Sequence, residues 1–378
     1  ANDTLVLSAA TNQENIVWPN TSGLTMRGAD GTTPLNVIID GQKVSRCITV
    51  AYPVTLNLIG MTVQNGAVSG HGAAIFVTSN VTLNMFSVII SKNSTNGANN
   101  GGGLYISPSS SVLAANCMFF SNTTSGNGGA INNAGALIEN NNTYASNIGT
   151  NGGAIQIQNG ASYKGVNNVF WNNSASALGN QLSNAGTVNV TYSDIGNGGI
   201  SGFVLNYDSI DHNIQGDPKF LNLAQGNLRL AKDSPCTESG TSFLYIAITT
   251  DLDGKQRPQG VKFDLGAFEA DWVNPIPQLK SNSHPLAYPT VFNPDNEKVK
   301  IFFNLTSGQI QRDMIKLRIY DLNGENIWED DVSGTVGSNF VEWSGRDNNE
   351  RDLPNGIYIF YVINGKAVVG KGKVVIMR

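Results

Sequence analysis

The feature that most constrains the fold of this 378-residue chain is a glycine- and asparagine-rich motif that returns at a nearly regular interval. It reads HGAAIFV, NGGGLYI, NGGAINN, NGGAIQI and, more weakly, LGNQLSN. The apolar residues that anchor it, spaced by 29, 27, 24 and 27 residues, are Ile75, Leu104, Ile131, Ile155 and Leu182. A period of roughly 20 to 50 residues is the signature of a stacked repeat architecture.

Each repeat also contains a short β-prone run with its own apolar anchor. These anchors are Leu83, Val112, Leu137 and Tyr163. Strands this short cannot stand alone, and parallel strands need a crossover that the short turns cannot supply. A chain that winds round one axis solves both problems, because each strand pairs with its counterpart in the next coil, about 4.8 Å away. The pattern predicts an all-β chain that begins as a right-handed, single-stranded parallel β-helix of seven to nine coils.

Asparagines recur at a constant place in these coils. A buried turn asparagine can bond its amide to the asparagine of the next coil, so we expect two structural ladders. The first ladder comprises Asn93, Asn122, Asn147 and Asn173, with Asn65 fitting the same place, and the second comprises Asn116, Asn141 and Asn167.

Charge divides the chain sharply. Residues 51 to 193 carry only Lys92, Glu139 and Lys164 as full charges, whereas residues 285 to 378 carry 11 basic and 12 acidic residues. The change follows the segment 271–285, which contains three prolines and is predicted to be a linker. We therefore expect a β-helix with capping ends over 1–270, and over 286–378 an immunoglobulin-like β-sandwich, because that region has alternating strands and charged turns.

Several longer segments resemble known families. GLTMRGADGTTPLNVIIDG and the closing GDPKFLN…DLDGKQRPQGVKFDLGAFE resemble choice-of-anchor β-helix surface proteins, a pectin-lyase-like fold. The Gly-Gly-Ala-Ile and Phe-x-x-Asn motifs resemble those of chlamydial polymorphic outer membrane proteins. YPTVFNP, IYDLNG, VEWSGRD and LPNGIYIFYV resemble the Ig-like domain of the flagellar hook-capping protein and type IX sorting domains. These resemblances imply export and surface display, and no known active site.

Catalysis on a β-helix needs carboxylates or bases that converge from adjacent coils. Glu139 has no acidic neighbour in sequence or one coil away, and Lys92 and Lys164 lie in different phases of the repeat. His71 is more consistent with a turn residue than with a base. We therefore predict no catalytic residue and no enzyme.

The weak metal candidates are Asp251 and Asp253 in DLDGKQRP, which resembles half a calcium loop but lacks the later acidic ligands. The alternative for both, and for Asp40, is a carboxylate that bonds turn amides. Arg257 is expected to pair with Asp264 or Glu269 and to close the last coil. No cofactor is predicted, and calcium is the one ion with any candidate site.

The cysteines, the net charge and the remaining sequence features limit where the protein could act and what it could bind. Three distant cysteines, Cys47, Cys117 and Cys236, fit small buried residues better than a zinc or redox motif. The net charge of −5 with no basic patch gives no support to nucleic-acid binding, and no apolar run could span a membrane. The start ANDTLVL fits a mature terminus after signal cleavage. Sequons at Asn20, Asn80 and Asn304 are candidate glycosylation sites.

The sequence thus predicts an extracellular or cell-surface protein with a structural or adhesive role, such as a self-associating subunit of a filament or coat. Its partners would be other copies of itself, cell-surface components or glycans. The rival interpretation is a carbohydrate-active enzyme, a lyase or hydrolase, or a glycan-binding module.

Overall fold

The computed structural model describes residues 3–202, 211–260, 262–270, 285–295, 298–305, 315–332, 337–364 and 367–378. The chain divides into two compact units, Ala1–Val273 and Asn274–Arg378. Apart from Pro285, the predicted linker lies outside the described residues. The described residues include no helix long and apolar enough to cross a membrane.

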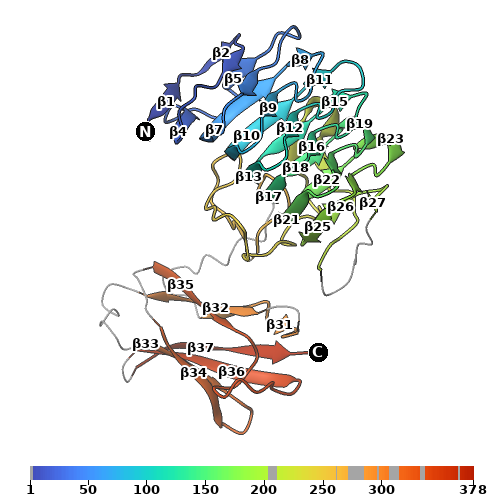
Figure 1. Ribbon diagram of the computed structural model, residues 1–378. Coiled ribbons are helices and arrows are strands. Elements are labelled where there is room, and N and C mark those ends of the chain that lie inside the picture. Colours follow the sequence, from blue (N-terminus) through green and yellow to red (C-terminus); the bar gives the residue numbers. More distant parts are fainter. Residues whose placement is uncertain are drawn as a thin grey trace. The chain divides into compact units, whose positions relative to one another are not determined.

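Unit 1 is a parallel β-helix of about seven turns (Figure 1). Its largest sheet, sheet A, runs in two rows that merge in the long strands β7 and β10. In chain order the strands of sheet A are β1 (Thr4–Leu7), β2 (Ala10–Asn12), β4 (Leu24–Gly28), β5 (Val37–Asp40), β7 (Thr55–Gln64), β10 (Thr82–Ser91), β13 (Ser111–Ala115), β14 (Met118–Phe120), β17 (Ala136–Asn140), β18 (Thr143–Ala145), β21 (Ser162–Val166), β22 (Val169–Trp171), β25 (Thr187–Thr191) and β26 (Asp194–Ile195).

Two further parallel sheets complete the wall of each coil. Sheet B contains β3 (Ile16–Val17), β6 (Ile48–Val50), β9 (Ile75–Val77), β12 (Leu104–Ile106), β16 (Ile131–Asn133), β20 (Ile155–Ile157), β24 (Leu182–Asn184) and β27 (Ile200–Ser201). Sheet C contains β8 (Ala67–Val68), β11 (Ser94–Thr95), β15 (Thr123–Thr124), β19 (Ile148–Asn151) and β23 (Ser174–Leu178).

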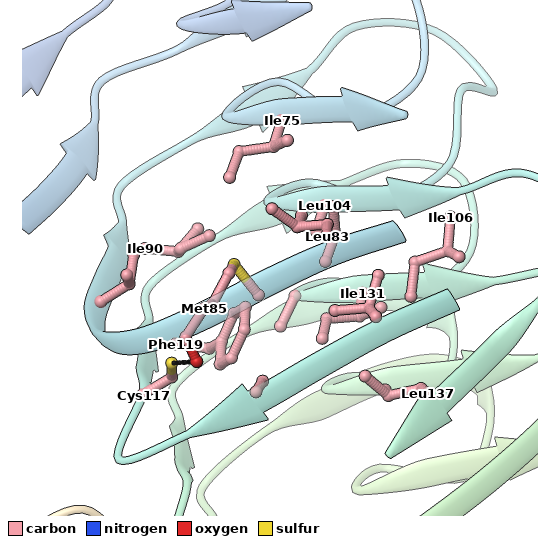
Figure 2. Packing of buried hydrophobic residues seen from close by; sticks show 14 of the residues in the cluster. Ile75, Leu83, Met85, Ile90, Leu104, Ile106, Cys117, Phe119, Ile131 and Leu137 are labelled. Atoms are coloured by element: carbon pink, nitrogen blue, oxygen red, sulfur yellow. Dashed lines mark hydrogen bonds between the residues drawn. The ribbon is translucent and has the colours of Figure 1, made fainter. Parts of the chain in front are cut away.

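The predicted repeat is confirmed by the strand register. Ile75, Leu104 and Ile131 are direct partners on β9, β12 and β16, and the series continues through Ile155 to Leu182. Figure 2 shows Ile75, Leu104 and Ile131 on successive strands, pointing into the interior that also holds Leu83 and Phe119. Apolar side chains at one phase of the repeat therefore build one continuous core, since each coil covers its neighbour.

The coils turn sharply at residues in the left-handed backbone region. Ser121, Ser146 and Asn172 have φ of 54°, 57° and 54°, and the residue after each points into the interior. The same corner recurs on the other row of sheet A at Asn116, Asn141 and Asn167, where φ is 53°, 55° and 57°. Asparagine tolerates this conformation better than most residues, which explains part of the asparagine content.

The first asparagine ladder follows one of these corners. The Asn93 amide donates to Asn122 (Nδ2 to Oδ1, 2.9 Å), Asn122 donates to Asn147 (3.0 Å), and Asn147 donates to Asn173 (2.8 Å). Each amide oxygen also accepts the backbone N–H of the preceding rung, as in Asn122 N to Asn147 Oδ1 at 3.0 Å. The ladder continues into Gln181, which accepts from Asn173 at 2.7 Å.

Asn65 is not part of this ladder. It occupies the left-handed corner (φ 54°), and the ladder place belongs to Gly66, whose N–H donates to Asn93 Oδ1 at 2.8 Å. Asn65 instead donates to Asp40 at 2.8 Å. The prediction was wrong by one residue because the corner residue and the inward residue are sequence neighbours, and asparagine suits both.

The second predicted ladder is displaced in the same way. Asn116, Asn141 and Asn167 are the corner residues, and among them only Asn167 donates to Asn141, at 3.3 Å. The inward column lies one residue later and consists of Cys117, Asn142, Asn168, Ser193 and Asn213. Along it, side-chain oxygens accept backbone N–H groups, as in Cys117 N to Asn142 Oδ1 (2.7 Å) and Asn142 N to Asn168 Oδ1 (2.8 Å).

The corner asparagines instead hold the segment 211–270, which we call the flank segment. Asn116, Asn141 and Asn167 donate to the backbone carbonyls of Thr250, Asp264 and Thr241 respectively. The flank segment contains the hairpin β28 (Phe220–Asn222) and β29 (Asn227–Leu230), joined by the 3-10 helix η1 (Leu223–Gln225). It runs along the outside of sheet A, where it is drawn in yellow to gold in Figure 1.

The flank segment therefore differs from the predicted end cap. Its apolar residues cover Ile89, Met118 and Phe120, which point outward from β10 and β14. The segment also reaches the last coil, where Ile214 forms a parallel bridge with Asp194 and Cys236 Sγ donates to the Asp194 carboxylate at 3.2 Å. A wall with large apolar residues on its outer face needs a cover, and this need decides the path of the segment.

Unit 2 is built from two sheets that share one apolar core. One sheet is antiparallel and contains β30 (Leu286–Tyr288), β32 (Val299–Leu305) and β35 (Gly337–Trp343). The other contains β31 (Val291–Phe292), β33 (Ile315–Tyr320), β34 (Asn326–Val332), β36 (Gly356–Asn364) and β37 (Ala367–Ile376), antiparallel except for the β31–β37 pair. Strand β34, NIWEDDV, lacks the clean alternation of apolar and polar residues expected of a half-buried strand.

Candidate functional site

The weak metal candidates are engaged in turns and an ion pair. Asp251 is 1% exposed and accepts N–H groups from Asp253 (2.9 Å) and Lys255 (2.8 Å) on one oxygen and from Glu269 (2.8 Å) on the other. The Asp253 carboxylate accepts from Arg229, with Nε 2.6 Å from Oδ2. In the described part of the chain, no group of three or more His, Cys, Asp or Glu residues could hold a metal ion.

Arg257 pairs with Glu269, one of its two predicted partners, at 2.8 Å from Nη1 to Oε1, and both side chains are fully buried. The guanidinium also donates to the backbone carbonyls of Asp264 and Gly266. Burial raises the pKa of Asp264 to about 7. The pair lies within the flank segment, so it closes that segment onto itself rather than closing the last coil.

Glu139 lies in the interior of the β-helix, where its carboxylate meets only hydrogen-bond donors. Oε2 accepts from Tyr144 Oη at 2.5 Å and Asn142 Nδ2 at 3.0 Å. Oε1 accepts from Tyr163 Oη at 2.6 Å and Asn168 Nδ2 at 3.3 Å. Burial raises the pKa of Glu139 to about 7, although the hydrogen bonds from Tyr144, Tyr163 and Asn142 lower it.

The surrounding coils leave room for this carboxylate. The residues that pair with Glu139 on the adjacent strands are Ala114 and Gly165, which are both small. A Cβ at Gly165 would lie 2.4 Å from Tyr163 Oη, so the tyrosine needs the glycine beside it. Sequence analysis sought an acidic partner for Glu139 and missed these neutral ones. Glu139 lies two residues after the anchor Leu137, and this spacing is the sequence signal that places Glu139 on the same inward face.

The other isolated ionisable side chains lie away from Glu139. His71 sits in a turn, where Nδ1 accepts the N–H of Asn100 at 2.9 Å, as expected for a turn residue. Lys92 occupies an exposed left-handed corner, and Lys164 points outward from β21. Asp40 accepts from Gln42 N at 2.8 Å, which matches a turn-capping carboxylate. The three cysteines are buried and free.

The outer face of sheet B carries an aromatic stack on its earlier coils. Phe76 and Tyr105 are register partners on β9 and β12 and stack with ring centroids 5.7 Å apart. His71 stacks on the same tyrosine at 4.6 Å, and the Arg46 guanidinium carbon lies 5.1 Å from the Phe76 ring centroid. These residues are half-buried, so the stack presents mainly its edges to solvent.

Further along the same face lies a groove of about 430 Å³, which we call the amide groove. Gln156, Ser183 and Ser201 are successive register partners on β20, β24 and β27 and form its floor. Ten residues line it: Asn127, Asn151, Gln156, Gln158, Leu178, Ser183, Asn184, Ala185, Ser201 and Gly202. Sequence analysis did not single out this site, because its members come from four consecutive coils and share no local motif.

The candidate glycosylation sites differ in access. Asn20 and Asn80 are exposed, and Asn80 lies in a turn with φ 64°. Asn304 is half-buried within β32 and faces Ser338 on β35. An oligosaccharide could reach the first two positions without disturbing a strand pair.

Comparison with known proteins adds no assignment, since no protein-family model matches the chain and no curated protein is similar to it.

Proposed function

We propose that this protein is an exported, extracellular structural and adhesive protein that associates head to tail with copies of itself into a filament or coat. The observation that carries the proposal is the open first coil. Strands β1, β2 and β3 pair on one side only, with β4, β5 and β6, within the described residues. Leu5, Val6 and Val17 on these strands are 57%, 47% and 64% exposed.

An open strand edge with apolar side chains is a template for a further strand. At the other end of the β-helix, β25, β23 and β27 are terminal strands in the described part of the chain, whereas β26, which ends the second row of sheet A, is already bridged by Ile214. The strands of sheets A, B and C all run parallel, so the first coil of one copy could continue the open strands of the last coil of another in the same direction. A contact between two different surfaces of the same molecule produces an open filament unless rotation closes it.

The test is assembly as a function of concentration, followed by light scattering and electron microscopy. Val6→Lys and Val17→Lys place charges on the open edge and are expected to block assembly. Phe243→Lys, at a residue 85% exposed on the flank segment, is the matched control and should assemble as wild type does. A wild-type protein that stays monomeric at every concentration, or an edge variant that assembles normally, would refute the head-to-tail contact.

Unit 2 supports a second contact in the same assembly. We propose that it is an immunoglobulin-like module that docks onto a neighbouring copy, because the charge needed to steer an encounter is concentrated there. The alternative is a type IX sorting domain that serves only as an address. A chain ending at Asn274 distinguishes the two, since assembly with an unchanged repeat would favour the address.

We further propose that the protein is not an enzyme. Support comes from the burial of charged groups in unit 1: Arg257 and Glu269 are fully buried, and Glu139 lies in the interior. The rival is a polysaccharide lyase or hydrolase. Release of unsaturated or reducing ends from pectins, alginates or arabinans, above a heat-inactivated control, would establish the rival.

Right-handed winding and membership of the choice-of-anchor and polymorphic outer membrane protein families remain part of this proposal.

A further inference from the structure

We propose that the amide groove binds a short neutral oligosaccharide. The lining of the groove carries no charge. None of the ten residues that line it is ionisable. A site for a phosphate, a sulfated glycan or a uronic acid would be expected to supply a cation, because anions are recognised by arginine, lysine or clustered N–H groups. An uncharged polar lining favours an uncharged polar ligand.

The groove offers hydrogen-bonding groups in the combination that sugar hydroxyls use. Each primary amide carries a carbonyl acceptor and an NH₂ donor, and a hydroxyl is both donor and acceptor. Asn151 donates to Asn127 Oδ1 at 2.8 Å, which fixes this pair. Within the described residues, Asn127 Nδ2 and Asn151 Oδ1 make no other hydrogen bond, so the pair presents one donor and one acceptor to adjacent hydroxyls.

Two glutamines of the groove are also held in place by hydrogen bonds. Gln156 Nε2 donates to the carbonyl of Ile157 at 2.8 Å, and Gln158 Nε2 donates to Asn132 Oδ1 at 2.5 Å. Their Oε1 atoms are then acceptors in defined positions. A site whose side chains are already ordered loses little conformational entropy when a ligand binds.

The shape of the groove favours a chain of sugars over a single sugar. Its residues come from four consecutive coils, so it spans roughly 14 Å along the axis at about 4.8 Å per coil. Its volume lies in the range of ligand sites. Leu178, 58% exposed, supplies an apolar wall for the C–H face of a pyranose ring. Leu178 and Ser201 lie on β23 and β27, which also end their sheets, but the inference rests on the lining of the groove and not on the head-to-tail contact.

The experiment measures binding of the full chain to neutral tetra- to hexasaccharides (cello-, xylo-, manno- and malto-series) by calorimetry and saturation-transfer NMR. Oligogalacturonates are the charged comparison. At least one neutral series is expected to bind, and Asn151→Ala and Leu178→Lys should each weaken that binding about tenfold or more, the loss expected for one or two contacts. Asn189→Ala, an exposed amide on the outer face of β25, is the matched control and should leave affinity unchanged.

Circular dichroism melts of the three variants establish that each is folded before affinities are compared. Three results would each overturn the proposal: no binding of any neutral series at millimolar concentration, equal affinity in the groove variants and the control, or a preference for oligogalacturonates. Failure to assemble leaves this measurement untouched, so the two proposals fail independently.

Discussion

At the scale of single residues, Glu139 is a fully buried carboxylate. Carboxylates are rarely fully buried without a counter-charge. Here two tyrosine hydroxyls and two asparagine amides donate to it in place of a cation. These donors offset part of the desolvation cost, and the remainder raises the pKa of Glu139 to about 7.

The raised pKa makes stability depend on pH in a defined direction. Below about pH 4.5, Glu139 is protonated in both states and contributes nothing to the dependence. Between pH 4.5 and 7 the unfolded state loses its proton first, so the free energy of unfolding falls, by about 3 kcal/mol in all. In Glu139→Gln, the fall in stability from pH 5 to pH 8 should shrink by most of that amount, as measured by denaturant titrations at both values.

Other buried acids also titrate in this pH range, so the pH dependence of each variant is compared with that of the wild-type protein. The glutamine introduced in Glu139→Gln would turn its own NH₂ toward an asparagine donor, but that cost is independent of pH and cancels. Glu14→Gln, at an exposed position, is the control and should keep the wild-type dependence. An unchanged dependence in Glu139→Gln would mean that the carboxylate is ionised throughout.

The asparagine ladder makes a second prediction at this scale. Asn147 uses its whole hydrogen-bonding capacity, donating to Asn173 Oδ1 and the Phe119 carbonyl and accepting twice from Asn122. Asn147→Ala leaves buried partners unsatisfied and should lower the free energy of unfolding by about 2–4 kcal/mol. Asn189→Ala should lower it by less than about 0.5 kcal/mol. Equal melting temperatures for the two variants would contradict a buried ladder.

At the scale of elements, the flank segment is the part of unit 1 that the repeat does not build. It covers apolar residues on the outer side of sheet A and is pinned by corner asparagines from three consecutive coils. Within the segment, Arg257 and Glu269 form a buried ion pair. The segment should therefore separate from the wall as a unit when that pair is broken.

Arg257→Met tests this view. Removal of the cation leaves Glu269 as an unpaired buried charge, a change that costs about 3–5 kcal/mol. Hydrogen exchange should then speed up at the N–H groups of residues 251–269, while the core strands β13, β17 and β21 keep their protection. The double variant Arg257→Met/Glu269→Gln should recover part of the loss. Global unfolding in the single variant would instead make the segment part of one cooperative unit with the coils.

At the scale of the whole molecule, the chain contains two apolar cores. The larger core runs through the coils of unit 1, and the smaller lies between the two sheets of unit 2. Each unit has its own core, so each can unfold as a separate cooperative unit.

Scanning calorimetry should accordingly show two transitions. A chain that ends at Asn274 should keep one of them at an unchanged temperature and lose the other, because few interactions are expected to cross a domain boundary. One merged transition in the full chain, together with a lower melting temperature in the shortened one, would mean that the units stabilise each other.

The repeat, the parallel winding and the inward anchors from Ile75 to Leu182 could all be predicted from the sequence. These follow from short-range periodicity, because a residue one period later occupies the same place on the next coil. The tertiary structure alone decided the donors around Glu139, the one-residue offset of the second asparagine column, the path of the flank segment and the amide groove. Those features depend on which of two neighbouring residues at a corner points inward and on contacts between distant residues, such as Asn116 with Thr250 across 134 positions, that leave no periodic trace.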